Sequence, residues 1–174
     1  ISKQRIERVP GIDLMLKICE LSSGVGQKIF LLGSKESIVT KTTEKLKQRF
    51  PLIDIVGYHS GFFTQEENDT IVSKINNSSA DIVFVGMGVP RQDIWIAKNL
   101  DRLNAMLLMG VGGSFDVISG DLKRAPLFMQ KAGLEWLYRI FQEPGKRLKI
   151  IPKLFSFECY VIRSYFESKR GGSR

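Results

Sequence analysis

Four short apolar runs recur along the chain at intervals of about 25 residues, and each ends at a glycine. The runs are Lys28–Gly33, Leu52–Gly57, Asp81–Gly86 and Met106–Gly110. Their hydrophobicity is nearly continuous rather than alternating, which is typical of parallel strands that are covered on both faces. The pattern therefore predicts four parallel strands.

The segments between these runs are amphipathic. Lys35–Phe50, Glu66–Asn76 and Asp93–Leu103 each carry apolar residues at the spacing of one buried helix face. Strands that alternate with helices form right-handed βαβ units. We therefore predict an α/β fold, a Rossmann-like parallel sheet flanked by helices, with more sheet upstream.

The pattern changes after the fourth run. Pro126–Gln142 and Gly145–Ser168 are long, aromatic and compatible with helices, and Glu143–Pro144–Gly145 predicts a break between them. Residues 145–174 hold eight basic and two acidic residues, a net +6 out of a total of +8. A basic amphipathic helix of this kind can lie in a membrane interface. The alternative is a helix packed on the domain or on a partner subunit.

We favour membrane contact for this region. The predicted organisation is a Rossmann-like core over residues 1–126 and a helical C-terminal region over residues 127–174. The latter ends in a C-terminal basic amphipathic helical appendage that associates with membranes.

Composition excludes several classes of protein. With 174 residues, 43% hydrophobic and 25% charged, the chain fits one well-buried domain with an appendage. Cys19 and Cys159 belong to no CxxC pair or Cys/His cluster, so we expect buried thiols rather than a zinc site or a disulfide scaffold. Because no run approaches roughly 20 apolar residues, we expect neither a membrane span nor a signal peptide.

Ligands bind at the strand ends of open α/β sheets, so the residues after each run are the candidate site. After the first run, Gly33 opens a turn in which Ser34 is suited to cap the next helix. After the second, Gly57–Phe63 holds His59, the single histidine, beside three aromatic residues. His59 could be a general base, but no neighbouring carboxylate would orient it, so we predict that this loop is a wall or floor of the pocket.

The third and fourth strand ends carry the strongest signal. Gly86, Met87 and Gly88 precede a proline suited to a helix's first turn, and Arg91 and Gln92 follow it. The chain then offers Gly112, Gly113, Ser114, Asp116 and Arg124. Glycine lets a phosphate or sugar approach the backbone, and helix N-termini and arginines favour anions. We predict a nucleotide-sugar site; the alternatives are a plain turn with a solvated Arg–Gln pair and structural caps at Ser114 and Asp116.

Several other nucleotide-site motifs are missing from the sequence. The chain contains neither a GxGxxG fingerprint nor a GxxxxGK[ST] loop, which disfavours NAD enzymes and P-loop NTPases. It also lacks a DxD acidic pair, which disfavours metal-dependent sugar transfer. We therefore expect no metal and no cofactor, with diphosphate charge met by backbone dipoles and arginines.

Five pieces of sequence together point to a family. They are Gly86–Gln92 with Trp95, Gly110–Gly120, Arg124–Pro126, Gly133–Arg139 and Glu143–Pro144. In this order they resemble the WecG/TagA/CpsF bacterial glycosyltransferases, glycosyltransferase family 26, from about Arg8 to Lys149. The resemblance implies an inverting, metal-independent enzyme that moves N-acetylmannosamine from a UDP-sugar donor to an undecaprenyl-diphosphate-GlcNAc acceptor. The product is the linkage unit of wall teichoic acid or of a related surface polymer.

The resemblance also implies roles for residues. Gln92 corresponds to the family's active-site glutamine, and Arg139, Lys146, Arg147 and Lys149 match cations that bind the lipid diphosphate. The family's proposed base, an aspartate, lies in a segment without a counterpart in this chain, so we expect further sequence upstream. A homo-oligomer at an anionic membrane surface, cytoplasmic and peripheral on the inner face of the bacterial membrane, is implied as well.

Two other functions stay open at this point. One is a relative that transfers N-acetylmannosaminuronate or a hexose for another surface polysaccharide. The other is a non-catalytic domain that binds a nucleotide sugar, or that binds nucleic acid through the basic tail. Because no nucleic-acid motif is recognisable, we expect no nucleic-acid partner.

Overall fold

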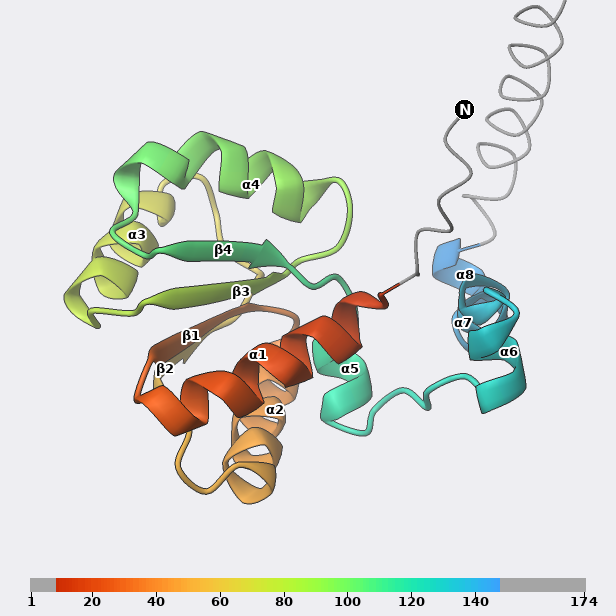
Figure 1. The fold of residues 1–174 in the computed structure, drawn as a ribbon. Coiled ribbons are helices and arrows are strands. Elements are labelled where there is room, and N and C mark those ends of the chain that lie inside the picture. The colour runs from red at the N-terminus through yellow and green to blue at the C-terminus, as the bar shows by residue number, and fades with distance from the viewer. Residues whose placement is uncertain (1–8, 148–174) are drawn as a thin grey trace, which may run out of the picture. The chain divides into compact units, whose positions relative to one another are not determined.

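The computed structural model describes residues 9–147. The chain divides into two compact units, Ile1–Lys123 and Arg124–Arg174. The described part of the first unit consists, in order, of α1 Gly11–Val25, β1 Lys28–Gly33, α2 Glu36–Arg49, β2 Asp54–His59, α3 Asn68–Asn77, β3 Ile82–Gly86, α4 Arg91–Asn99, the 3₁₀ turn η1 Leu100–Arg102, β4 Leu107–Gly110 and α5 Ser114–Ile118 (Figure 1). The described part of the second consists of α6 Leu127–Lys131, α7 Glu135–Gln142 and α8 Pro144–Arg147.

The four strands form one parallel sheet in the order β2-β1-β3-β4. The chain passes from β1 to β2 on one side of β1 and then returns to β3 on its other side. The carboxyl ends of β1 and β3 are therefore a topological switch point, where open α/β sheets form a binding crevice. The predicted α/β fold, a Rossmann-like parallel sheet flanked by helices, is confirmed.

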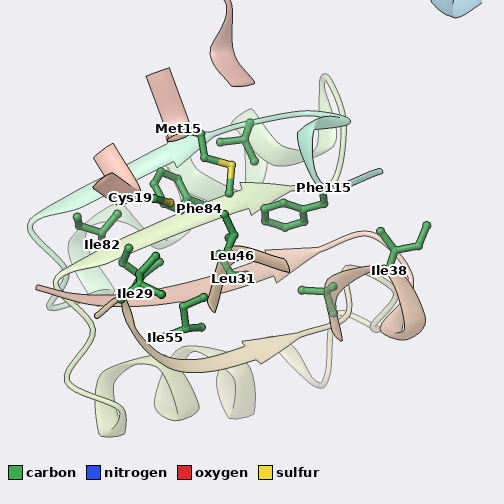
Figure 2. Close-up of a cluster of buried hydrophobic side chains, with 13 residues drawn as sticks. Met15, Cys19, Ile29, Leu31, Ile38, Leu46, Ile55, Ile82, Phe84 and Phe115 are labelled. Carbon is green, nitrogen blue, oxygen red and sulfur yellow. The ribbon is translucent and has the colours of Figure 1, made fainter. Parts of the chain in front are cut away.

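Successive side chains of a strand point to opposite faces of the sheet, and helices cover both faces. On β1, Ile29 and Leu31 belong to one buried cluster, and Phe30 and Leu32 belong to the other. The first cluster includes side chains of α1, α2 and α5, some of which Figure 2 labels. The second includes side chains of α3 and α4. Burial on both faces explains why the sequence runs are continuously apolar.

Cys19 belongs to the first cluster and is fully buried. Burial raises the pKa of this thiol to about 12, although the charge of Arg49 opposes the rise. The thiol is therefore protonated and unreactive at neutral pH. The prediction of a buried thiol is confirmed for Cys19, whereas Cys159 lies outside the described residues.

The predicted limits of β2 are wrong by two residues at each end, since the strand runs over Asp54–His59 rather than Leu52–Gly57. Leu52 lies in a turn and is 77% exposed. Gly57 lies inside the strand, and a Cβ there would come within 2.6 Å of the Phe30 ring. This glycine therefore makes room for an aromatic ring instead of ending the strand.

The helical prediction for Pro126–Gln142 is also corrected. The segment forms α6 and α7, separated at Gly133, whose φ of 73° lies in the region that glycine adopts readily. The predicted break near Glu143 is confirmed, because α7 ends at Gln142 and α8 begins at Pro144. The amphipathic stretch beyond Arg147 lies outside the described residues, and no helix within residues 9–147 is long and apolar enough to cross a membrane.

Candidate functional site

The candidate site lies at the switch point, where β1 and β3 end side by side. Gly33 pairs with Gly86 in the sheet, and a Cβ on Gly33 would lie 2.4 Å from the Gly86 carbonyl carbon. A Cβ on Gly86 would in turn lie 2.7 Å from the Phe115 ring of α5. These two predicted glycines allow the strand ends and α5 to approach closely. By contrast, a Cβ on Gly88 or on Gly112 would meet no atom within 4 Å, so the backbones of these two glycines border open space.

Ser34 does not cap α2, and this prediction is wrong. The residue at the N-cap is Lys35, and no side chain caps the helix. Instead, the Ser34 N–H donates to the Gly86 carbonyl at 2.9 Å, and the Ser34 carbonyl accepts from the Gly61 N–H at 2.9 Å. The Ser60 hydroxyl donates to the same carbonyl at 3.2 Å. Ser34 thus connects the end of β1 to β3 and to the loop after β2.

Gln92 connects the two glycine loops that the sequence singled out. It lies in the first turn of α4 and is 5% exposed. Its Oε1 accepts a hydrogen bond from the Gly112 N–H at 2.9 Å. The side chain packs against Gly110, where a Cβ would lie 2.6 Å from Nε2. None of the residues that the structure describes accepts a hydrogen bond from Nε2.

Arg91 positions the loop that follows β2. Its Nη2 donates to the Gly61 carbonyl at 3.0 Å, and its guanidinium carbon lies 6.0 Å from the centroid of the Phe62 ring. Met87 also packs here, because its Cγ would be 2.9 Å from a Cβ on Gly61. The structure therefore brings the predicted residues Met87 and Arg91 to the loop that we expected to form a wall of the pocket.

His59 ends β2 beside this loop. Its Nδ1 lies 2.8 Å from the Ser60 carbonyl, to which a protonated Nδ1 donates. The imidazole meets the Phe63 ring edge-on, with the ring centroids 6.1 Å apart. These contacts describe a histidine packed into the loop, and within residues 9–147 no hydrogen bond or ion pair joins its ring to a carboxylate.

Gly113 is the N-cap of α5, and Ser114 begins the helix. The Ser114 N–H and hydroxyl both donate to the Val111 carbonyl, at 3.1 and 2.6 Å, and the residue is 3% exposed. Both of its donors are therefore used within the loop. Asp116 lies in the first turn of α5 and is half-buried, so its carboxylate belongs to the short helix that follows Gly112.

The other predicted residues lie in the second unit. The Nε of Arg124 is 3.9 Å from a carboxylate oxygen of Glu135. Arg139 lies in the last turn of α7 and is half-buried. Lys146 and Arg147 end α8, and Lys149 lies outside the described residues.

A cleft with a volume of about 190 Å³ opens next to the glycine loops, between the loop after β2 and α4. Met87 and Arg91 line it from the glycine side, and Trp95 and Lys98 line it further along α4. Sequence reasoning missed Lys98 as a site residue and used Trp95 only as a family marker. Positions 91, 95 and 98 share one face of a helix, which indicates that Lys98 lies on the same side of α4 as Arg91 but not that a cleft lies there.

The donors at the strand ends are backbone N–H groups, the Gln92 amide and the Arg91 guanidinium, and Lys98 lines the adjoining cleft. Within residues 9–147, no group of three or more His, Cys, Asp or Glu side chains is arranged to hold a metal ion. Such donors suit an anionic or hydroxyl-rich ligand, which backbone dipoles and cations can hold.

Comparison with known proteins adds an independent line of evidence. The sequence model of the "Glycosyl transferase WecG/TagA/CpsF family" matches residues 1–171. The chain is 37% identical over 147 residues to the N-acetylglucosaminyldiphosphoundecaprenol N-acetyl-beta-D-mannosaminyltransferase of Staphylococcus aureus strain MW2, and equally to the protein of that name from strain NCTC 8325 / PS 47. Each match covers 83% of this chain and 57% of the relative, so the chain spans little more than half the length of these relatives.

Proposed function

Because the chain belongs to the WecG/TagA/CpsF glycosyl transferase family, we propose that it binds the donor of a glycosyltransferase. The proposed reaction transfers N-acetylmannosamine from UDP-N-acetylmannosamine to undecaprenyl-diphosphate-linked GlcNAc, with inversion and without a metal ion. The product is the linkage unit of wall teichoic acid. We propose that the protein works as a homo-oligomer at the inner face of the cell membrane.

The observation that carries the donor proposal is the meeting of two glycine loops at the carboxyl ends of β3 and β4, beside the switch point of the sheet. Gly88 and Gly112 have open space beside their backbones, and Gln92 joins the two loops through Gly112. A nucleotide diphosphate fits this environment because main-chain N–H groups and a helix N-terminus stabilise its charge. Asp116, on the element after Gly112, is a candidate to accept hydrogen bonds from ribose or sugar hydroxyls.

In the proposed transfer, the acceptor hydroxyl oxygen forms a bond to C1 of N-acetylmannosamine. The bond between C1 and the β-phosphate oxygen breaks, UDP leaves with the electron pair, and a general base takes the hydroxyl proton. We propose that Gln92 stabilises the departing diphosphate. Its Oε1 is used by Gly112, whereas its Nε2 donates to no described residue and is available to a phosphate oxygen.

We propose a division of labour along the chain. Residues 1–126 bind the UDP-sugar donor, and residues 127–174 contact the lipid diphosphate of the acceptor and the membrane surface. Arg139, Lys146, Arg147 and Lys149 are the candidate cations for the lipid diphosphate. The net +6 over residues 145–174 supports an anionic membrane surface as the partner of this region.

The test of the reaction uses the protein that carries this chain at its natural length. Incubation with UDP-N-acetylmannosamine and a short-chain lipid-diphosphate-GlcNAc should release UDP, and the absence of release would overturn the proposed activity. Competition by UDP-N-acetylmannosaminuronate or by UDP-hexoses identifies the donor. A competitor that is itself turned over faster would replace N-acetylmannosamine in the proposal.

Two substitutions of Gln92 distinguish the role of its Oε1 from the role of its Nε2. Gln92→Glu keeps an oxygen for the Gly112 N–H but removes the Nε2 donor, whereas Gln92→Ala removes both. We expect each variant to lose about 100-fold or more in kcat, as when an oxyanion donor is removed. Gln48→Ala, on the exposed face of α2, is the matched control and should keep wild-type activity. Wild-type kcat in Gln92→Glu with an unchanged circular dichroism spectrum would remove Nε2 from the mechanism.

A further inference from the structure

The cleft beside the glycine loops is a second binding feature of the first unit. One wall is α4, and the other is the segment that holds Phe63, Gln65 and Asn68. Met87, the residue directly after Gly86, lines one end of it. Met87 and Arg91 thus belong both to the candidate donor site and to the lining of the cleft, so the two features adjoin.

The α4 wall has a cation near each end and apolar surface between them. Arg91, Ile94, Trp95 and Lys98 all line the cleft, and their spacing of three, four and seven residues puts them on one face of the helix. Arg91 and Lys98 are separated by about 10 Å along the helix axis, at 1.5 Å per residue.

The base of the cleft is held by a buried polar network. The Trp95 indole N–H donates to Asn68 Oδ1 at 2.8 Å, and Asn68 Nδ2 donates to Asn99 Oδ1 at 3.0 Å. Asn68 and Asn99 are 5% and 2% exposed. Because these polar atoms bond to one another, Trp95 is fixed in orientation, and with Met87 it presents apolar surface to a ligand.

Two polar side chains of the cleft lack a partner among residues 9–147. Neither the Lys98 ammonium nor the Gln65 amide makes a side-chain hydrogen bond or ion pair to a described residue. Arg91, by contrast, uses its guanidinium on Gly61 and Phe62. The cleft thus combines a rigid apolar base, a neutral amide and one available cation at the end away from the glycine loops.

We propose that this cleft binds the N-acetylhexosamine of the acceptor and that Lys98 binds the phosphate bonded to that sugar, which leaves Arg139, Lys146, Arg147 and Lys149 as candidate cations for the outer phosphate of the lipid diphosphate. This inference rests on the proposed glycosyltransferase function. The acetamido methyl packs on Trp95 and Met87, Gln65 bonds to the sugar's polar groups, and the attacked donor lies beyond Met87. The orientation follows from charge, because the phosphate end of the acceptor meets Lys98 and the free hydroxyl end meets the glycine loops.

Binding to the cleft is tested on the protein at its natural length without any donor. This chain has two tryptophans, Trp95 and Trp136. In a variant in which Trp136 and any tryptophan outside this chain are replaced by Phe, Trp95 is the one fluorescent reporter. Titration with a GlcNAc diphosphate that carries a short alkyl chain should change Trp95 emission to saturation. The corresponding glucose diphosphate, which lacks the acetamido group, should bind more weakly. No change in Trp95 emission, or equal affinity for both sugars, would overturn the proposal.

The role of Lys98 is tested in the otherwise native protein. Lys98→Ala should raise the KM for the acceptor about tenfold or more and leave the KM for UDP-N-acetylmannosamine unchanged. Lys47→Ala, an exposed lysine of α2, is the control and should change neither value. An unchanged acceptor KM in Lys98→Ala, in a protein that still turns over, contradicts this inference alone. Absence of turnover in the wild type contradicts the proposed function, while the fluorescence titration still decides the cleft.

Discussion

Both units of the chain contain amphipathic helices, but the apolar faces of these helices are buried to different extents. In the first unit, α2 buries Ile38, Val39 and Leu46 against the sheet. In the second, no residue of α7 is buried, and Trp136 and Phe141 are 49% and 72% exposed. An apolar helix face is thus covered in one unit and uncovered in the described part of the other. This difference indicates that the first unit is stabilised by its own core, whereas the described part of the second unit has apolar surface available to a partner.

The largest effect should come from the same truncation made in both units. Phe84→Ala empties a fully buried position of the first cluster and should lower the free energy of unfolding by about 3–5 kcal/mol (Figure 2). Phe141→Ala, at an exposed position, should change it by no more than about 0.5 kcal/mol. Urea unfolding followed by circular dichroism measures both values. Equal losses in the two variants would remove the distinction between the units.

A smaller effect is expected at the strand ends. Gly33→Ala forces a Cβ against the backbone of Gly86, at a φ of 145°, and should destabilise the first unit by about 1–3 kcal/mol. It should also weaken UDP binding, because the two strand ends are pushed apart. Gly24→Ala, in α1 with nothing within 4 Å, should instead be neutral or stabilising. Urea unfolding and calorimetric titration with UDP distinguish these results, and a neutral Gly33→Ala would mean that the close approach is unimportant.

The third effect sharpens the contrast at the surface. If the exposed face of α7 meets a membrane, Phe141→Ala should weaken binding to anionic vesicles about tenfold, the loss expected for one buried phenyl ring. Leu52→Ala, which removes an exposed apolar side chain of the first unit, should leave vesicle binding unchanged. Co-sedimentation measures both. Salt-dependent RNA binding that outcompetes the vesicles would favour nucleic acid as the partner of the basic region.

The smallest effect concerns pH. A hydrogen bond from Arg102, aided by its charge, lowers the pKa of Asp69 at the start of α3. A lowered carboxylate pKa stabilises the fold above the ordinary aspartate pKa of about 3.9, and this stabilisation is lost as the pH falls through the lowered value. Asp69→Asn should therefore reduce Tm slightly at pH 7, and the difference should disappear as the pH falls through the lowered pKa. A Tm difference between the variant and the wild type that grows toward low pH would contradict a lowered pKa of Asp69.

Much of the first unit could be predicted from the sequence because its central strands, β1 and β3, are buried on both faces. β1 has the predicted limits, and β3 and β4 differ from them by one residue at the start. The errors arise where a distant residue decides the local structure. Phe30 explains Gly57 inside β2, and the carbonyl of Gly86 explains the conformation of Ser34. Neither contact is visible in a local sequence pattern.

The residues of the candidate site stand out in the sequence, but the contacts between them do not. The glycine loops and Gln92 remain a prediction as a binding site, and the hydrogen bond from Gly112 to Gln92 is a contact that the sequence does not indicate. The cleft along α4 was missed because its lining depends on Asn68, whose side chain is buried by a contact across 31 residues with Asn99. Burial of a polar side chain at a helix start gives no periodic signal.

The backbone of Ser34 has a consequence for the thermodynamics of ligand binding. Its carbonyl and its N–H join the ends of β1 and β3 and the loop after β2, which would otherwise move independently, so their conformational entropy is lost when the protein folds and not when a ligand binds. A preorganised edge of this kind binds more tightly than a flexible one with the same contacts. A substitution that displaces Gly86 or Gly61 would therefore raise the dissociation constant of a ligand bound at this edge of the sheet.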